Sequence, residues 1–175
     1  IRIMTKDSGT NDVLELLHVT DGKVDSDATR NMPEVEAVIK RIHELILADE
    51  DNEENPVSIG VVSPFRGQVD LISKAIRQVL TETTIRKHQI EVGTAHTFQG
   101  DERDVMIFSL AIADNSFAQS LTFLQKPNLF NVAITRARKK LITFISKDPK
   151  SLPPGLLKDY IEYTQQYIES AKEDE

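Results

Sequence analysis

Apolar residues follow two alternating periods along this chain, one typical of buried strands and one typical of amphipathic helices. The first apolar run, at 14–19, predicts a strand closed by a turn. Pro33 suits the first turn of a helix, and apolar residues recur beyond it at helical spacing, so we expect a helix capped by Asn31 or Met32. The continuous run at 57–62 is rich in β-branched residues, which predicts a strand buried on both faces of a sheet.

The same alternation continues to the end of the chain. The remaining expected elements are a helix at 69–80, strands at 90–95 and 105–111, a helix at 129–137, a strand at 141–145 and a last helix at 156–168. This succession predicts an α/β fold, with an open and mostly parallel sheet covered by helices on both faces in three layers. We expect residues 1–148 to form this domain, and 149–175 to add a C-terminal helix and an acidic tail that pack on it or trail from it.

Length and composition narrow the class of protein. The chain has 175 residues, 39% of them hydrophobic and 28% charged, which is typical of one globular domain. It contains no cysteine and no apolar run of about 18 residues, which excludes a disulfide scaffold, a thiolate metal site and a transmembrane helix. We therefore expect a cytoplasmic protein with no membrane partner. Because the sequence opens on Ile1 without a signal pattern, we also expect it to be part of a longer protein.

The net charge of −7 argues at first against a nucleic-acid partner, since proteins that bind phosphates usually carry a basic surface. However, two short runs, at 49–54 and 173–175, hold eight of the 28 acidic residues, and such runs are usually a solvated loop and a solvated tail. The other acidic residues are matched by 21 Lys and Arg. The body of the domain is therefore close to neutral, and a nucleic-acid partner remains compatible with the sequence.

Signatures of a self-contained catalytic centre are missing. No Gly-x-x-x-x-Gly-Lys-Ser/Thr segment occurs, so the chain lacks the phosphate cradle of a P-loop nucleotidase. Residues 45–50 resemble the apolar strand ending in Asp-Glu that binds Mg²⁺ in such enzymes, but their apolar positions continue a helical period that begins at Val35. The four histidines show no paired metal-ligand spacing. We predict no metal site in this chain.

Three polar segments are candidates for binding, at 63–68, 96–102 and 129–138. We expect all three at the carboxyl ends of the strands, where open α/β sheets bind their ligands. Around Gly100, the amide, carboxylate and guanidinium groups of 99–103 suit a ribose or phosphates, and the alternative is a plain polar turn. Arg136 suits an arginine finger, and the alternative is a solvated basic face. Gln68, at a strand-to-helix junction, suits either an anion site or a helix cap.

Taken together, the segments 57–68, 92–104 and 131–138 resemble the second RecA-like domain of superfamily 1 helicases. The branch they resemble contains the nonsense-mediated-decay RNA helicase and related DNA helicases. The spacing of Asn31 and Glu34 is also similar to a helix start in that domain, and the resemblance covers roughly residues 10–147. It implies a RecA-like fold of the P-loop NTPase type.

The resemblance implies roles for individual residues. Gly100 and Glu102 would face the nucleotide, and Arg136 would reach the γ-phosphate of ATP as the catalytic arginine finger. Arg138 is a weaker second candidate for that contact, and Phe65 is expected in the core. The residues expected along the nucleic-acid path are Ser63, Pro64, Gln68, His96, Thr97 and Gln99.

The family builds its ATP site between two RecA-like domains, and this sequence has no counterpart of the first. The resemblance therefore implies the C-terminal motor domain of an ATP-dependent DNA or RNA helicase. ATP and Mg²⁺ would be bound mainly by the first RecA-like domain of the parent chain, and this fragment alone would not hydrolyse ATP. Its partners would be that first domain and single-stranded DNA or RNA. The alternative is a non-catalytic RecA-like module that docks nucleic acid or a protein.

Overall fold

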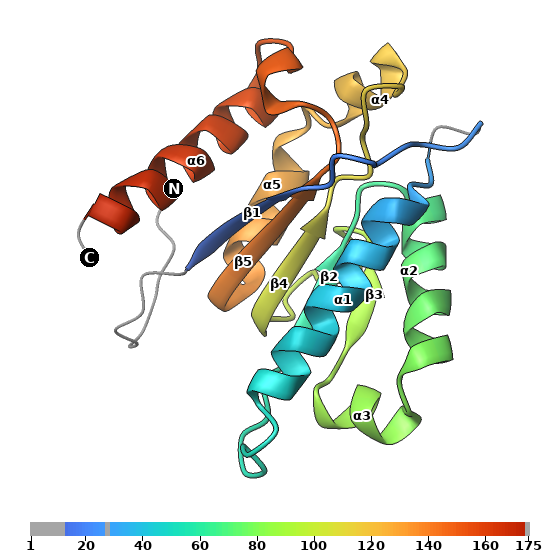
Figure 1. Cartoon of the computed structure of the whole chain (residues 1–175), viewed down its shortest axis with the longest axis vertical. Coiled ribbons are helices and arrows are strands. Elements are labelled where there is room, and N and C mark those ends of the chain that lie inside the picture. Colours follow the sequence, from blue (N-terminus) through green and yellow to red (C-terminus); the bar gives the residue numbers. More distant parts are fainter. Residues whose placement is uncertain (1–12, 27–28, 174–175) are drawn as a thin grey trace.

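Five strands form one parallel sheet in the order β1-β5-β4-β2-β3 (Figure 1). The computed structural model describes residues 13–26 and 29–173. The strands are β1 (Leu14–His18), β2 (Ile59–Val62), β3 (Glu91–Gly93), β4 (Arg103–Ser109) and β5 (Ala137–Ile145). The central strands β2 and β4 are almost completely buried, which agrees with their continuous apolar runs.

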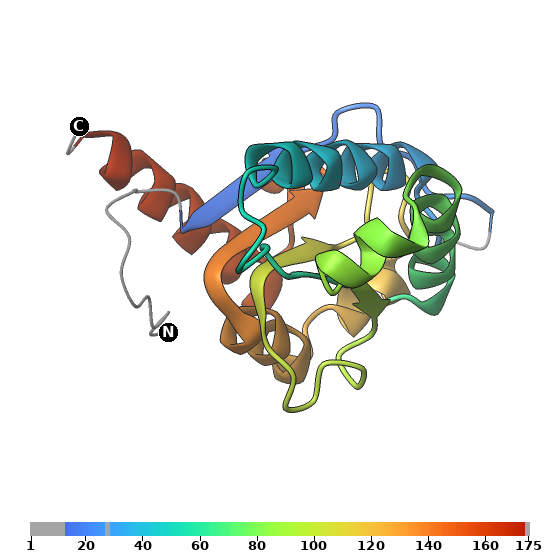
Figure 2. The ribbon, with the colours of Figure 1, turned by 90° about the horizontal axis from the view of Figure 1, so that it is seen from below.

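Helices cover both faces of the sheet (Figure 2). One face carries α1 (Met32–Ala48), α2 (Arg66–Val79) and α3 (Glu82–Lys87), and the other carries α4 (Ala118–Phe123), α5 (Pro127–Arg136) and α6 (Leu156–Glu173). Side chains of β4 alternate between the two cores, because successive residues of a strand point to opposite faces: Val105 and Ile107 pack towards α1 and α2, whereas Met106 and Phe108 pack towards α5 and α6. The predicted three-layer α/β arrangement is confirmed.

The C-terminal helix α6 packs beside β1 and shares the core of the α5 face. Tyr160 of α6 lies within 5.1 Å of the Phe130 ring and 6.3 Å of the Phe108 ring, measured between centroids. Its buried hydroxyl forms a 2.5 Å hydrogen bond with Thr143 of β5. Within the described residues, no helix combines the length and apolar character that a membrane span requires.

The structure decides between the two expected caps of α1 and differs from the expectation at other boundaries. Asn31 is the cap of α1, since its side chain accepts a hydrogen bond from the Glu34 amide at 3.2 Å. Strand β5 begins at Ala137, four residues before the predicted start, because Ala137 and Lys140 pair with Arg103 and Val105 of β4 around a register shift, beyond the apolar core. The short helices α3 and α4 were not predicted, because they bury no residue completely and so leave no apolar stripe in the sequence.

The two ends of the parallel strands define two edges of the sheet. We call the edge after Val62, Gly93, Ser109 and Ile145 the carboxyl edge, and the edge where the strands begin the amino edge. Helix α5 runs antiparallel to the strands, so its last residue lies at the amino edge. The expectation of the carboxyl edge is therefore wrong for Arg136 and Arg138 at the end of 129–138, and for the end of 96–102, which leads into the start of β4.

Candidate functional site

The amino edge brings together the residues expected to face a nucleotide. Arg103 of β4 pairs with Ala137 of β5, so Glu102 and Arg136, which precede them, lie at the same end of adjacent strands. Gly100 stands two residues before Glu102, is exposed, and has a φ of +83°. A Cβ on Gly100 would meet no atom within 4 Å, so the backbone here is open to a ligand.

Arg136 is the last residue of α5 and is partly buried. Its Nε atom is buried and has no hydrogen-bond partner, and its guanidinium makes no ion pair with any residue in the described part of the chain. Buried polar atoms in proteins are nearly always hydrogen-bonded, so an unpartnered guanidinium nitrogen is compatible with an anion that binds from outside this chain.

The loop that carries Glu102 is held by Arg103, which is only 7% exposed. Arg103 donates hydrogen bonds to the carbonyl oxygens of Glu102 and Gln89, each at 3.0 Å, and pairs with the carboxylates of Glu91 at 2.7 Å and Asp101 at 2.8 Å. We expected the Arg103 guanidinium to be available to a ligand, and this was wrong because these four contacts occupy it. The Glu102 carboxylate is exposed and forms no contact with another described side chain.

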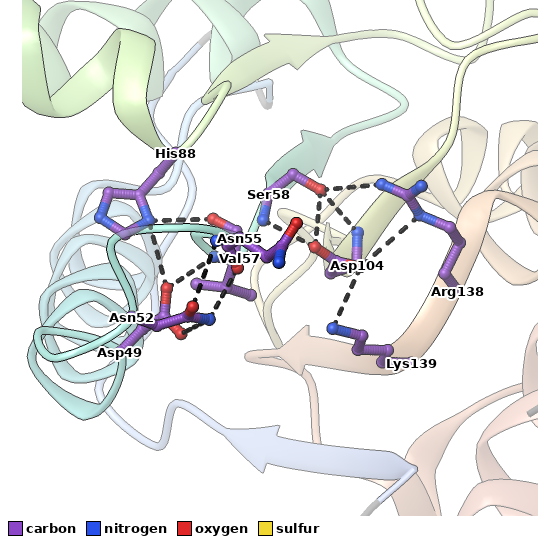
Figure 3. A network of polar contacts seen from close by, with 9 residues as sticks. All are labelled: Asp49, Asn52, Asn55, Val57, Ser58, His88, Asp104, Arg138 and Lys139. Atoms are coloured by element: carbon purple, nitrogen blue, oxygen red, sulfur yellow. Dashed lines mark hydrogen bonds and ion pairs between the residues drawn. The ribbon is translucent and has the colours of Figure 1, made fainter. Parts of the chain in front are cut away.

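Arg138, the second candidate for a phosphate contact, lies in β5 and is already engaged (Figure 3). Its guanidinium donates to Ser58 Oγ at 3.2 Å and lies 3.6 Å from the Asp104 carboxylate, which also pairs with Lys139 at 3.5 Å. Burial works to raise the pKa of Asp104, but hydrogen bonds from Ser58 and the charges of Lys139 and Arg138 outweigh it and lower that pKa. Asp104 is therefore ionised at neutral pH.

The same network extends away from Arg138 towards α1 (Figure 3). Asp49, in the acidic run after α1, accepts a hydrogen bond from the Val57 amide at 2.6 Å. The imidazole of His88, which is 2% exposed, lies 2.9 Å from the Val57 carbonyl oxygen. These contacts fix the backbone immediately before Ser58, so Ser58 and Asp104 stand on a rigid base.

At the carboxyl edge, Ser63, Pro64 and Gln68 are buried. The Gln68 side chain accepts from the Asn31 amide at 2.8 Å and donates to the Asn31 carbonyl at 3.3 Å and Ser109 Oγ at 3.2 Å. The side chains of Ser63 and Gln68 are not exposed in this structure, so the expectation that they contact nucleic acid directly is corrected. Gln68 instead joins the start of α2 to α1 and β4. Phe65 packs against the core, as expected.

Glu34 lies at the centre of this buried network and is fully inaccessible. It accepts hydrogen bonds from Ser109 Oγ at 2.7 Å, Ser146 Oγ at 2.6 Å and the Ala111 amide at 2.7 Å. Burial raises its pKa to about 7, and these three hydrogen bonds oppose that rise. Only the spacing of Asn31 and Glu34 pointed to this network in the sequence, because Ser109 and Ser146 come from distant strands.

The segment 94–102 connects the two edges. It leaves β3 at the carboxyl edge and reaches the start of β4 at the amino edge, crossing over β2, where Phe98 is buried against Gly60. His96, Thr97 and Gln99 are exposed along it. Among residues 13–26 and 29–173, no three His, Asp or Glu side chains gather closely enough to hold a metal ion.

The protein family described as an AAA domain matches residues 6–148. DNA polymerase alpha-associated DNA helicase A of Saccharomyces cerevisiae is 40% identical over 85 residues, which cover 49% of this chain and 11% of that protein. Regulator of nonsense transcripts 1 of Dictyostelium discoideum is 36% identical over 99 residues, which cover 54% of this chain and 7% of that protein. This chain belongs to the superfamily 1 helicases.

A homolog of regulator of nonsense transcripts 1 in Arabidopsis thaliana is 34% identical over 116 residues, which cover 62% of this chain and 9% of the relative. The chain thus spans about a tenth of the length of these helicase relatives. Its five parallel strands and flanking helices are a RecA-like arrangement, and the family match lies in the C-terminal region of superfamily 1 helicases.

Proposed function

We propose that this helicase domain is the C-terminal motor domain of an ATP-dependent enzyme that moves along single-stranded DNA or RNA, and that Arg136 is its arginine finger. The observation that carries the proposal is the unpartnered, partly buried guanidinium of Arg136, which lies at the same end of the sheet as Glu102. A guanidinium held in this way supplies two or more donors to phosphate oxygens without first breaking an internal ion pair.

Bound ATP with its Mg²⁺ would supply the phosphoryl group and the charge that has to be stabilised. Arg136 would donate to the γ-phosphate as negative charge develops there, a role that contributes about 10³-fold or more to turnover in related phosphoryl-transfer enzymes. Glu102 accepts but cannot donate hydrogen bonds when ionised, so it suits ribose hydroxyls better than phosphate oxygens. The described residues offer no carboxylate cluster for Mg²⁺, so we assign the metal to the first RecA-like domain of the parent chain.

Nucleic acid would contact the exposed side of the carboxyl edge. His96, Thr97 and Gln99 offer polar side chains to solvent there and along the crossing segment. Gln68 would act indirectly, because its hydrogen bonds anchor the start of α2 and thereby the backbone of 63–67. Alternate closing and opening of the two domains around ATP would move such a grip along the strand.

The test is Arg136→Ala in the full-length parent, with nucleic-acid-stimulated ATP hydrolysis as the measurement. We expect kcat to fall about 10³-fold while ATP binding changes little, because the finger acts mainly on charge in the transition state. Arg77→Ala, which removes an exposed cation from the last turn of α2, is the matched control and should leave kcat unchanged. Weakened ATP binding with normal turnover would contradict the assignment. An intact parent without ATP turnover would favour a non-catalytic binding module.

A further inference from the structure

The position of Arg136 depends on the strand that follows it. Helix α5 ends at Arg136 and β5 begins at Ala137, with no loop between them. Any movement of the first residues of β5 is therefore transmitted to the backbone of Arg136. Arg138 and Lys139, the next residues of β5, are 50% and 62% exposed in their side chains, so apolar packing does not fix them.

Asp104 is the group that holds both of these cations (Figure 3). One of its carboxylate oxygens faces Arg138 at 3.6 Å and Lys139 at 3.5 Å, and the other accepts from the amide of Ser58 at 3.0 Å and from its hydroxyl at 3.1 Å. The Asp104 amide donates back to Ser58 Oγ at 2.9 Å. Four hydrogen-bonding or ionic contacts thus orient one carboxylate, which is itself only 14% exposed.

No other described carboxylate holds these two cations. Among the described residues, the side-chain polar contacts of Arg138 are with Ser58 and Asp104, and that of Lys139 is with Asp104. Without the negative charge of Asp104, two positive side chains would stand unpaired within three residues of Arg136. Arg138 would then be free to compete for any anion that binds at the amino edge.

We propose that Asp104 is a positioning residue for Arg136. By holding Arg138 and Lys139 against the start of β4, Asp104 fixes the junction between α5 and β5 and keeps a second guanidinium away from the nucleotide. Arg138 is then part of the support of the finger and is not a second finger. This inference rests on the proposed function, since it concerns the step that Arg136 performs.

The experiment measures kcat and KM for ATP in the full-length parent carrying Asp104→Asn. The amide keeps an acceptor for Ser58 but places a neutral group before the two cations. We expect kcat to fall between about 10-fold and 100-fold, because small misplacements of a catalytic group have effects of this size, while KM for ATP stays within about twofold. Arg138→Gln should lower kcat similarly. The double variant should be no worse than either single variant, because both remove the same contact.

Glu15→Gln is the matched control. Glu15 of β1 is 20% exposed and pairs with Lys140 of β5 at 2.7 Å, one residue farther from the finger than Lys139. Glu15→Gln therefore removes a comparable carboxylate that pairs with a lysine of β5, and also with Arg41 of α1 at 2.7 Å, without touching Arg138 or Lys139. We expect kcat of this variant to match that of the wild type when both are assayed well below their melting temperatures.

The outcomes separate the inference from the proposed function. If Arg136→Ala abolishes turnover while Asp104→Asn behaves like Glu15→Gln, the positioning role is wrong and the finger stands. If Asp104→Asn lowers kcat but Arg138→Gln does not, Asp104 does not act through Arg138 and the inference is overturned. If Arg136→Ala leaves kcat unchanged, the proposed function fails and the inference fails with it.

Discussion

The two edges of the sheet differ in whether their polar side chains find hydrogen-bond partners within the chain. At the carboxyl edge, Glu34 and Gln68 are inaccessible, and hydrogen bonds within the chain occupy both side chains. At the amino edge, Arg136 and Glu102 have no partner in the described chain, although their neighbours Arg103 and Asp104 are fully engaged. A closed network stabilises the fold, whereas an open group beside a supported backbone is suited to an external ligand.

The largest expected change in the free energy of unfolding comes from a substitution at the carboxyl edge. Glu34→Ala leaves the hydroxyls of Ser109 and Ser146 and the amide of Ala111 without their acceptor in the core. Because unsatisfied buried donors are costly, we expect the free energy of unfolding to fall by about 4 kcal/mol. Urea denaturation at pH 5, where Glu34 is protonated, measures this loss. A loss below about 1 kcal/mol would mean that the network is not closed as described.

The raised pKa of Glu34 predicts a pH dependence of stability. The unfolded chain releases this proton near the ordinary value of 4.5, whereas the folded chain keeps it up to about pH 7. The protonated Glu34 side chain therefore contributes about 3 kcal/mol to the free energy of unfolding. This contribution is fully present below pH 4.5 and is lost as the pH rises through about 7.

Glu34→Gln removes this titration while keeping the shape of the side chain. Subtracting its unfolding free energy from that of the wild type, at several pH values between 4 and 8, isolates Glu34 from all other groups. The difference should decline with rising pH, and a flat difference would contradict the assigned pKa.

A smaller change in the free energy of unfolding is expected from a substitution at Gly100, which is exposed at the amino edge. Gly100→Ala forces a side chain into a φ of +83°, although a Cβ there meets no neighbour. The cost is therefore conformational alone, about 1 kcal/mol in the free energy of unfolding. A much larger loss, measured by urea denaturation, would show that the position is packed and closed to a ligand.

The smallest effect on stability is expected for Arg136→Ala. Because Arg136 has no partner within the described chain, its removal should change the free energy of unfolding by less than about 0.5 kcal/mol. Urea denaturation of this chain alone measures it. This result, combined with the large loss of turnover expected in the parent, would separate a ligand-binding residue from a structural one. A fall of several kcal/mol in the free energy of unfolding would show that Arg136 has a structural role, like the hydrogen-bonded side chains of the carboxyl edge.

The spacing of apolar residues was sufficient to predict the three layers of this fold. The β-branched run at 57–62 became β2, and the apolar stripe after Pro33 became α1 with Asn31 as its cap. The same spacing did not predict α3 or the start of β5, because these residues lie outside the core and show no apolar pattern in the sequence. Of the site, the sequence identified Arg136, Gly100 and Glu102 as candidates but placed all three at the wrong edge of the sheet.

Burial imposes a period on the residues of each element, so the buried side chains and the order of the strands and helices follow from the amino-acid sequence. Which polar groups find hydrogen-bond partners depends instead on how the folded chain brings distant segments together. Glu34 finds its partners in Ser109 and Ser146, which lie 75 and 112 residues farther along the chain, and Asp104 meets Arg138 only through the pairing of β4 with β5. Hydrogen bonds between distant segments leave no local pattern, so folding alone separates the closed carboxyl edge from the open amino edge.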